Sequence, residues 1–246
     1  MTTSTTAIIP ARLASTRFPR KVLAAATGKP LIQHVCERVG LCRDLSRIVV
    51  ATDSTEVRDV VRAFGGECVM TREDHPNGTS RLAEAAAALG LHGDALVVNV
   101  QGDEPEIEPD AISAAIRASR VTNAEVATIA SPFAPGEDPS NPNIVKVVAG
   151  VTGLALYFSR SLIPHRRDAA GFAAPPLKHI GLYVYRAAFL QTYVTLAPTP
   201  LERTEMLEQL RVLEHGHRIA VATHACTTQG IDTPEQYAAF VARLSG

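Results

Sequence analysis

Short apolar runs recur along the first half of the chain with the length of buried strands. They cover residues 7–10, 47–52, 67–70 and 94–100, and polar or turn-forming residues bound each one. Apolar runs of this length are typical of strands that are covered on both faces of a sheet. The run at 94–100 is the most apolar, so we expect a central, parallel strand there.

Stretches with helical spacing and helix-start signals lie between these strands. Residues 30–42 begin with a proline, and a helix that ends at residue 64 follows Asp53 and Ser54, either of which can cap it. Residues 77–89 open on Asn-Gly-Thr-Ser and become alanine-rich, and residues 109–119 again begin with a proline. The alternation of strand and helix predicts an α/β fold with a doubly wound, mostly parallel sheet.

The second half of the chain changes character at residue 131. Residues 131–143 hold four prolines and predict a loop, and residues 144–149 and 154–159 flank a Gly-Val-Thr-Gly turn and predict a hairpin. The remaining predicted elements are strands at 124–130, 178–185 and 217–223 and helices at 204–215 and 234–244. We therefore expect a single domain over 1–246 with a smaller antiparallel lobe at about 131–215.

Composition excludes several classes of partner. The net charge of the 246 residues is −1, so no global field favours nucleic acid or a membrane surface, and any anion site must be local. The four cysteines form no C-x-x-C pair, which indicates reduced thiols. We see neither a signal peptide nor a long apolar span and expect a cytoplasmic protein with no membrane and no nucleic-acid partner.

A cationic segment follows the first predicted strand. Residues 11–21 contain Arg12, Arg17, Arg20 and Lys21 and no acidic residue. The simpler interpretation is a solvated charged turn. Its place at the carboxyl end of a strand favours a polyphosphate site instead, because α/β folds bind ligands at that edge. No G-x-x-x-x-G-K-[ST] motif is present, which argues against a kinase or GTPase.

An acidic pair ends the most apolar strand. Asp103 and Glu104 lie in the sequence Gln-Gly-Asp-Glu-Pro, in which Gly102 permits close backbone approach. A carboxylate at this place can hold Mg²⁺ against phosphate oxygens, or it can simply form a turn or cap the next helix.

A second carboxylate precedes the last predicted helix. Asp232 is followed by Thr233 and Pro234, so that Asp232 or Thr233 is a plausible helix cap. The same carboxylate can also be a metal ligand, and the two interpretations are compatible.

A turn at residues 75–81 combines glycine and hydroxyl side chains just before a predicted helix. It suits contact with a base or ribose through backbone groups, and it suits a plain capped turn equally well. The lobe contributes further polar and aromatic candidates, which are Arg160, His179, Tyr183, Tyr185, Glu208 and Gln209.

Taken in order, these segments resemble the 3-deoxy-manno-octulosonate cytidylyltransferase family. The resemblance runs nearly end to end, and its specificity comes from the order and spacing of the matching blocks. These blocks are residues 9–12, 14–17, 28–30, 50–53, 70–72, 98–105, 141–143, 145–148, 155–160, 205–211 and 232–235.

The resemblance implies a reaction and its requirements. CTP gives CMP to the anomeric 2-hydroxyl of 3-deoxy-D-manno-octulosonate (Kdo), and CMP-Kdo and pyrophosphate form for lipopolysaccharide biosynthesis. The family is Mg²⁺-dependent, cytoplasmic and usually homodimeric, with the second lobe forming much of the interface.

The resemblance also assigns residues. It implies catalytic roles for Arg12, Lys21 and Asp103 and metal ligation by Asp103 and Asp232. The implied CTP-binding residues are Ala11, Arg12, Ser15, Lys21, Gly78, Arg81 and Gln101, and the implied Kdo-binding residues are Arg160, His179, Tyr185, Glu208 and Gln209.

Three positions depart from the family pattern. Arg20 stands where the family usually has glycine, Ser80 replaces a glutamate, and residues 165–168 read His-Arg-Arg-Asp in place of Trp-Asp-Arg-Asp. Two alternatives stay open. One is a cytidylyltransferase for another 2-keto sugar acid, such as a sialic acid. The other is a nucleotide-binding protein that has kept the fold without catalysis.

Overall fold

The computed structural model divides the chain into two compact units. Unit 1 comprises residues 1–113, 186–194 and 228–246, and unit 2 comprises residues 114–185 and 195–227. The structure describes residues 4–13, 17–75, 77–168, 174–227 and 230–245.

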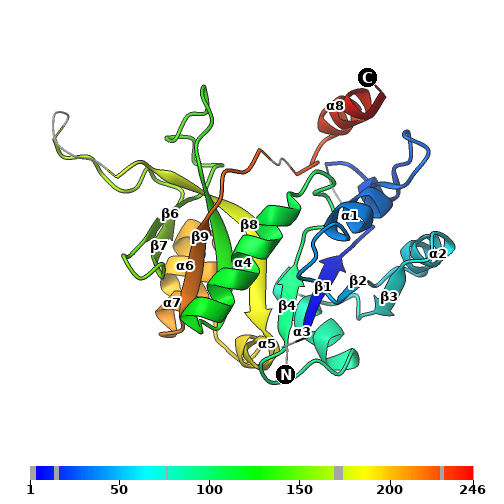
Figure 1. Ribbon diagram of the computed structural model, residues 1–246, viewed down its shortest axis with the longest axis horizontal. Coiled ribbons are helices and arrows are strands. Elements are labelled where there is room, and N and C mark those ends of the chain that lie inside the picture. Colours follow the sequence, from blue (N-terminus) through cyan, green and yellow to red (C-terminus); the bar gives the residue numbers. More distant parts are fainter. Residues whose placement is uncertain (1–3, 14–16, 76, 169–173, 228–229, 246) are drawn as a thin grey trace. The chain divides into compact units, whose positions relative to one another are not determined.

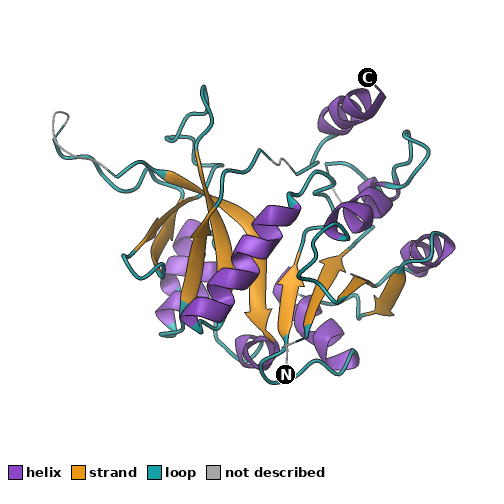
Figure 2. Cartoon of the chain, in the orientation of Figure 1, coloured by secondary structure: helices purple, strands orange, loops and turns teal. Residues whose placement is uncertain are grey.

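Unit 1 contains a parallel sheet, and its strands run in the order β3 (Glu67–Met70), β2 (Arg47–Thr52), β1 (Thr5–Pro10) and β4 (Leu96–Asn99) (Figures 1 and 2). All of β1 except its last residue is buried, as is all of β4. The four predicted strands of the first half are therefore confirmed, and β1 and β4 end beside one another at the edge where the cationic segment begins.

The helices of unit 1 include the five that the sequence predicts there. They are η1 (Lys21–Leu23), α1 (Leu31–Val39), α2 (Thr55–Ala63), α3 (Gly78–Ala88), α5 (Ala187–Tyr193) and α8 (Pro234–Ser245), while α4 (Pro109–Thr122) begins in unit 1 and continues into unit 2. The Ser54 hydroxyl caps α2 by accepting from the Val57 amide, and the Asn77 side chain caps α3 by accepting from the Ser80 amide at 2.8 Å. The helix α5 was not predicted.

An aromatic cluster fixes the last helix within unit 1. Tyr237 and Phe240 of α8 pack against Leu31 of α1, and the ring centroids of Phe18 and Tyr237 lie 5.5 Å apart. The Tyr237 hydroxyl also accepts from the Ala26 amide at 2.8 Å. These contacts bring the segment that precedes α8 to the cationic segment near the start of the chain.

Unit 2 is built on β5 (Val126–Pro132), which pairs antiparallel with β8 (Leu177–Arg186) and parallel with β9 (Ile219–Thr223). The predicted hairpin is confirmed as β6 (Lys146–Ala149) and β7 (Ala155–Ser159), and β6 also pairs antiparallel with β8. The expected antiparallel character of the second half is therefore present, with β9 as a parallel exception.

The prediction of one helix over 204–215 is wrong. Two short helices, α6 (Pro200–Glu205) and α7 (Gln209–Glu214), replace it, and Met206 between them is left-handed with φ 53°. No glycine or proline marks the break. Its cause is tertiary: the Glu205 carboxylate accepts from the Ser159 hydroxyl at 2.6 Å and from the Arg160 amide at 2.9 Å.

Two further features concern the predictions of reduced cysteines and of no membrane span. The cysteines Cys36, Cys42, Cys68 and Cys226 are free thiols. Among the described residues, no helix combines the length and the apolar character that crossing a bilayer demands.

Candidate active site

Lys21 is the centre of a charged cluster in unit 1. Its Nζ donates to Asp103 Oδ2 at 2.6 Å, to the Ile231 carbonyl at 2.8 Å and to Asp232 Oδ1 at 3.1 Å. The Lys21 side chain is 11% exposed, compared with 27% for Asp103 and 43% for Asp232. Three segments that are far apart in the sequence thus place one cation and two carboxylates in direct contact, and solvent reaches the carboxylates.

The end of β4 positions Asp103. A Cβ added to Gly102 would lie 2.7 Å from the Pro10 carbonyl oxygen, so only glycine allows this backbone to pass so close to the end of β1. The Asp103 carbonyl then accepts from the Ile231 amide at 2.8 Å and holds the segment that carries Asp232.

Asp232 and Thr233 were both candidates to cap the last helix, and Thr233 is the residue that caps it. The Gln236 amide donates to the Thr233 hydroxyl at 3.3 Å, and the Gln236 side chain accepts from the amides of Asp232 and Thr233. Because Thr233 supplies the cap, the Asp232 carboxylate is available to Lys21 and to Arg17, whose Nη2 lies 3.0 Å from Oδ2.

The oxygens around Lys21 fit a divalent cation. Two carboxylates and a backbone carbonyl converge on one positively charged atom. These are the oxygen types that Mg²⁺ takes from proteins, usually one or two carboxylates with phosphate and water completing the shell. The donor set therefore suits Mg²⁺.

Glu104 contrasts with its neighbour Asp103. Its Oε2 is buried with no hydrogen-bond partner in the part of the chain that the structure describes. Burial, with a smaller contribution from the charge of Asp103, raises the pKa of Glu104 to about 8 and favours its neutral form near pH 7. Of the acidic pair, Asp103 alone contacts Lys21.

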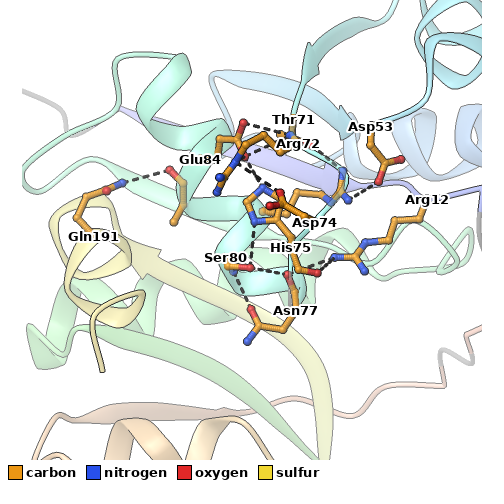
Figure 3. A network of polar contacts seen from close by, with 12 residues as sticks. Arg12, Asp53, Thr71, Arg72, Asp74, His75, Asn77, Ser80, Glu84 and Gln191 are labelled. Atoms are coloured by element: carbon orange, nitrogen blue, oxygen red, sulfur yellow. Dashed lines mark hydrogen bonds and ion pairs between the residues drawn. The ribbon is translucent and has the colours of Figure 1, made fainter. Parts of the chain in front are cut away.

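The other predicted nucleotide residues of unit 1 have defined environments. Ala11 is fully buried, and its amide donates to the Ala51 carbonyl. The Arg12 guanidinium donates to the carbonyls of His75 and Asn77 at 3.4 and 3.3 Å (Figure 3). Gly78 begins α3, and Gln101 is half-buried in the turn before Asp103. Ser15 lies outside the described residues.

Arg81 is buried and engaged inside unit 1. Its side chain has no exposed surface, forms an ion pair with Asp53 and donates to the Thr71 hydroxyl at 2.6 Å. Asp53 follows β2 and Thr71 follows β3, so Arg81 ties together the carboxyl ends of two strands. Burial of a charged pair is invisible to a sequence pattern, which explains why this structural contact was not predicted.

Arg160 is held firmly within unit 2. Its Nε donates to the Glu205 carbonyl at 2.7 Å and its Nη1 to the Pro142 carbonyl at 3.1 Å. The Arg160 carbonyl accepts from Lys146, which is fully buried and also donates to the carbonyls of Asn141 and Ile144. Sequence reasoning missed Lys146 and Glu205, although a lysine inside an apolar Val-Lys-Val-Val run was the available signal.

Aromatic rings line one face of β8. The His179 ring lies 5.1 Å from Phe158 and 5.3 Å from Tyr183, and Tyr183 stacks on Tyr185 at 5.8 Å. Gln209, the first residue of α7, is buried, whereas Glu208, which precedes it, is exposed and lies between α6 and α7, where one continuous helix was predicted. Unit 2 therefore contains all five predicted sugar-binding residues.

The His179 ring is expected to make unit 2 sensitive to acid. Burial lowers the pKa of His179 to about 4, from an ordinary value of 6.5. The neutral ring therefore contributes stability that is complete above pH 6.5 and is lost as the pH falls through 4. Urea unfolding should show a loss on the order of 2–3 kcal/mol between pH 7 and pH 4 that is absent in His179→Gln. The exposed His165→Gln serves as control and should keep the wild-type loss, and equal losses in all three proteins would contradict this assignment.

Arg20 adopts a left-handed backbone conformation, with φ 59°, just before η1. From the sequence, Arg20 is a departure from a glycine, the residue that adopts this conformation most easily. Arg20→Gly is expected to stabilise the protein by about 0.5–1 kcal/mol, because glycine adopts this conformation without steric cost. Arg20→Ala removes the exposed ion pair with Glu56 and keeps the Cβ. Urea unfolding should give a higher free energy of unfolding for Arg20→Gly than for Arg20→Ala. The reverse order would contradict backbone strain at Arg20.

Comparison with known proteins identifies relatives over nearly the whole chain. The family profile described as Cytidylyltransferase matches residues 6–219. A protein from Syntrophobacter fumaroxidans named 3-deoxy-manno-octulosonate cytidylyltransferase is 49% identical over 239 residues, which cover 97% of this chain and 96% of that protein. One of the same name from Syntrophotalea carbinolica is 47% identical, over 99% of both chains. A solved structure of CMP:2-keto-3-deoxy-manno-octonic acid synthetase complexed with CTP is 39% identical, has a TM-score of 0.91 and is matched over 99% of both chains.

Proposed function

The chain belongs to the 3-deoxy-manno-octulosonate cytidylyltransferase family, and from this premise we propose that it transfers CMP from CTP to the anomeric 2-hydroxyl of Kdo. The products are CMP-Kdo, for lipopolysaccharide biosynthesis, and pyrophosphate. The observation that carries the proposal is the convergence of Lys21, Asp103 and Asp232, because it combines phosphate-binding charge with the ligands of a divalent cation.

In this proposal the triphosphate of CTP lies between the cationic segment and the carboxylates. Arg12 and Lys21 bind phosphate oxygens, and Ala11, Ser15, Gly78 and Gln101 line the nucleotide site. Arg81 acts from inside the unit by holding the strand ends on which the site is built. Phosphoryl-type transfer depends on positioning and on charge stabilisation, and both are supplied by fixed cations of this kind.

Asp103 and Asp232 would hold Mg²⁺, because their carboxylate oxygens are of the kind that this ion binds. Bound there, Mg²⁺ would neutralise charge on the phosphates of CTP. The chain's own contribution to the displacement is to keep CTP in line while the bond from the Kdo 2-oxygen to the α-phosphorus forms and the bond to the pyrophosphate oxygen breaks.

We further propose that unit 2 supplies the Kdo site through Arg160, His179, Tyr185, Glu208 and Gln209. The carboxylate of a sugar acid needs a cationic partner, and the carbonyls of Glu205 and Pro142 hold the Arg160 guanidinium in one orientation. The whole chain then works as one nucleotidyltransferase domain, with residues 131–215 as the sugar-binding and dimerisation lobe.

A homodimer in the cytoplasm completes the proposal. Unit 2 exposes several large apolar side chains, among them Val151, Leu156 and Met206, which supports an interface on this unit. The oligomeric state is measured directly by light scattering of the purified protein.

A pyrophosphate-release assay tests the proposed activity. The protein should release pyrophosphate from CTP in the presence of Mg²⁺ and Kdo, and release should stop when Kdo is omitted or EDTA is added. N-acetylneuraminate should support little release. Preference for N-acetylneuraminate would favour another 2-keto sugar acid as substrate, and CTP binding without release for any such acid would favour a non-catalytic nucleotide-binding protein.

A further inference from the structure

A polar network at the start of α3 surrounds the buried side chain of His75 (Figure 3). Its Nε2 contacts the Glu84 carboxylate, and its Nδ1 lies 3.1 Å from the Ser80 hydroxyl. Both partners project from α3, whereas His75 lies in the loop that follows β3. The ring therefore fixes this loop to the helix through both of its nitrogens.

Glu84 holds the same loop at a second point. Its carboxylate accepts from the Arg72 amide at 3.2 and 3.3 Å. Burial raises the pKa of Glu84, but the hydrogen bonds from His75 and the Arg72 backbone outweigh it and lower the pKa overall. An ionised Glu84 is an acceptor only, so Nε2 of His75 is the donor in their contact.

The loop that His75 fixes is the loop that holds Arg12. Arg12 Nη2 donates to the backbone carbonyls of His75 and Asn77, 63 and 65 residues further along the chain. The Ser80 hydroxyl, which contacts the His75 ring, also donates to the Asn77 carbonyl at 2.9 Å. A displacement of the His75 ring would thus move two carbonyl oxygens that accept from the Arg12 guanidinium.

We propose that His75 is a positioning residue, which acts through its own carbonyl and that of Asn77 to aim the Arg12 guanidinium at the phosphates of CTP. The inference rests on the proposed function, because it takes Arg12 as a phosphate ligand. Glu84 and Ser80 are the supports of His75. Ser80 stands where the family pattern has glutamate, so this chain uses a hydroxyl at that place.

The test compares CTP binding by titration calorimetry, with Mg²⁺ and without Kdo, across matched variants. His75→Ala, Ser80→Ala and Glu84→Gln remove members of the network. His75→Gln keeps an N–H donor near the position of Nε2. Glu37→Gln is the control, because Glu37 lies on α1 and forms an exposed ion pair with Lys29 instead. Each variant is also made in an Arg12→Ala background, and steady-state kinetics give KM for CTP and for Kdo.

The proposal predicts that His75→Ala weakens CTP binding and raises KM for CTP by about ten-fold, while KM for Kdo stays within two-fold. Glu84→Gln and Ser80→Ala should have smaller effects in the same direction, His75→Gln should recover part of the loss, and Glu37→Gln should match wild type. In the Arg12→Ala background, His75→Ala should cost no more than two-fold, because the group that it positions is already absent.

Two results would overturn the inference while wild type still binds CTP. One is wild-type CTP binding by the network variants, and the other is a full ten-fold loss on His75→Ala in the Arg12→Ala background. If His75→Ala fails to fold, Ser80→Ala and Glu84→Gln test the inference by the same comparison between the wild-type and Arg12→Ala backgrounds. If wild type itself binds no CTP, the proposed function fails, and the inference fails with it.

Discussion

Lys21→Met is expected to lower kcat/KM for CTP by about 10²–10³-fold in the pyrophosphate-release assay. The substitution removes the most buried cation of the charged cluster, which contacts Asp103, Asp232 and the Ile231 carbonyl. In the proposed function the phosphates of CTP then lose a fixed positive charge, and two carboxylates face each other with no ammonium between them. Methionine keeps an unbranched side chain as far as Cε and lacks only the ammonium group, so the effect reports the loss of that group.

The matched control for Lys21→Met is Lys29→Met. Lys29 lies eight residues further along the chain in the same unit, is half-exposed and pairs only with Glu37 among the contacts described. Lys29→Met should keep kcat/KM within two-fold, because exposed ion pairs contribute little. Lys21→Arg, which keeps the charge, should retain more activity than Lys21→Met. A kcat/KM for Lys21→Met within ten-fold of wild type, in a protein with a wild-type melting temperature, would contradict the role of Lys21.

Asp103→Asn is expected to lower kcat by about 10²–10³-fold and to leave KM for Kdo nearly unchanged. The carboxamide keeps the shape of the side chain but loses the negative charge that contacts Lys21 and that would bind Mg²⁺. The loss should be accompanied by a higher Mg²⁺ concentration for half-maximal rate, because a neutral oxygen is a weaker ligand.

Asp94→Asn is the matched control for Asp103→Asn. Asp94 precedes β4, whereas Asp103 follows it, and Asp94 is largely exposed beside Arg186. Its replacement should leave kcat and the Mg²⁺ dependence unchanged. A near-wild-type kcat for Asp103→Asn would exclude a metal role for this carboxylate.

Most of unit 1 was predictable because local signals and tertiary packing agree there. The bounds of β2 and β3 match the apolar runs, and the Ser54 and Asn77 caps were readable from short polar side chains before helical spacing. The break at Met206 was not predictable, because the contacts of Glu205 with Ser159 and Arg160 override a sequence that continues to favour helix.

The site was predictable only in part, for a related reason. Lys21 and Asp103 were predictable because each lies in a segment that follows a strand, and parallel strands bring their carboxyl ends to one edge of the sheet. The sequence did not decide whether Asp232 or Thr233 caps the last helix. In the structure Thr233 caps it, which leaves the Asp232 carboxylate for other contacts. The sequence also gives no sign that Arg81 is buried against Asp53, since burial of a charge depends on packing around it.

The central claim is that Arg12 and Lys21, together with Asp103 and Asp232, act on the same triphosphate. A crystal structure of the protein with CTP and Mg²⁺ tests it most directly. We predict phosphate oxygens within hydrogen-bond distance of Lys21 Nζ and the Arg12 guanidinium, and a cation that the two carboxylates share with those phosphates. A nucleotide bound elsewhere, with Lys21 still paired to Asp103 and no phosphate near either, would contradict it.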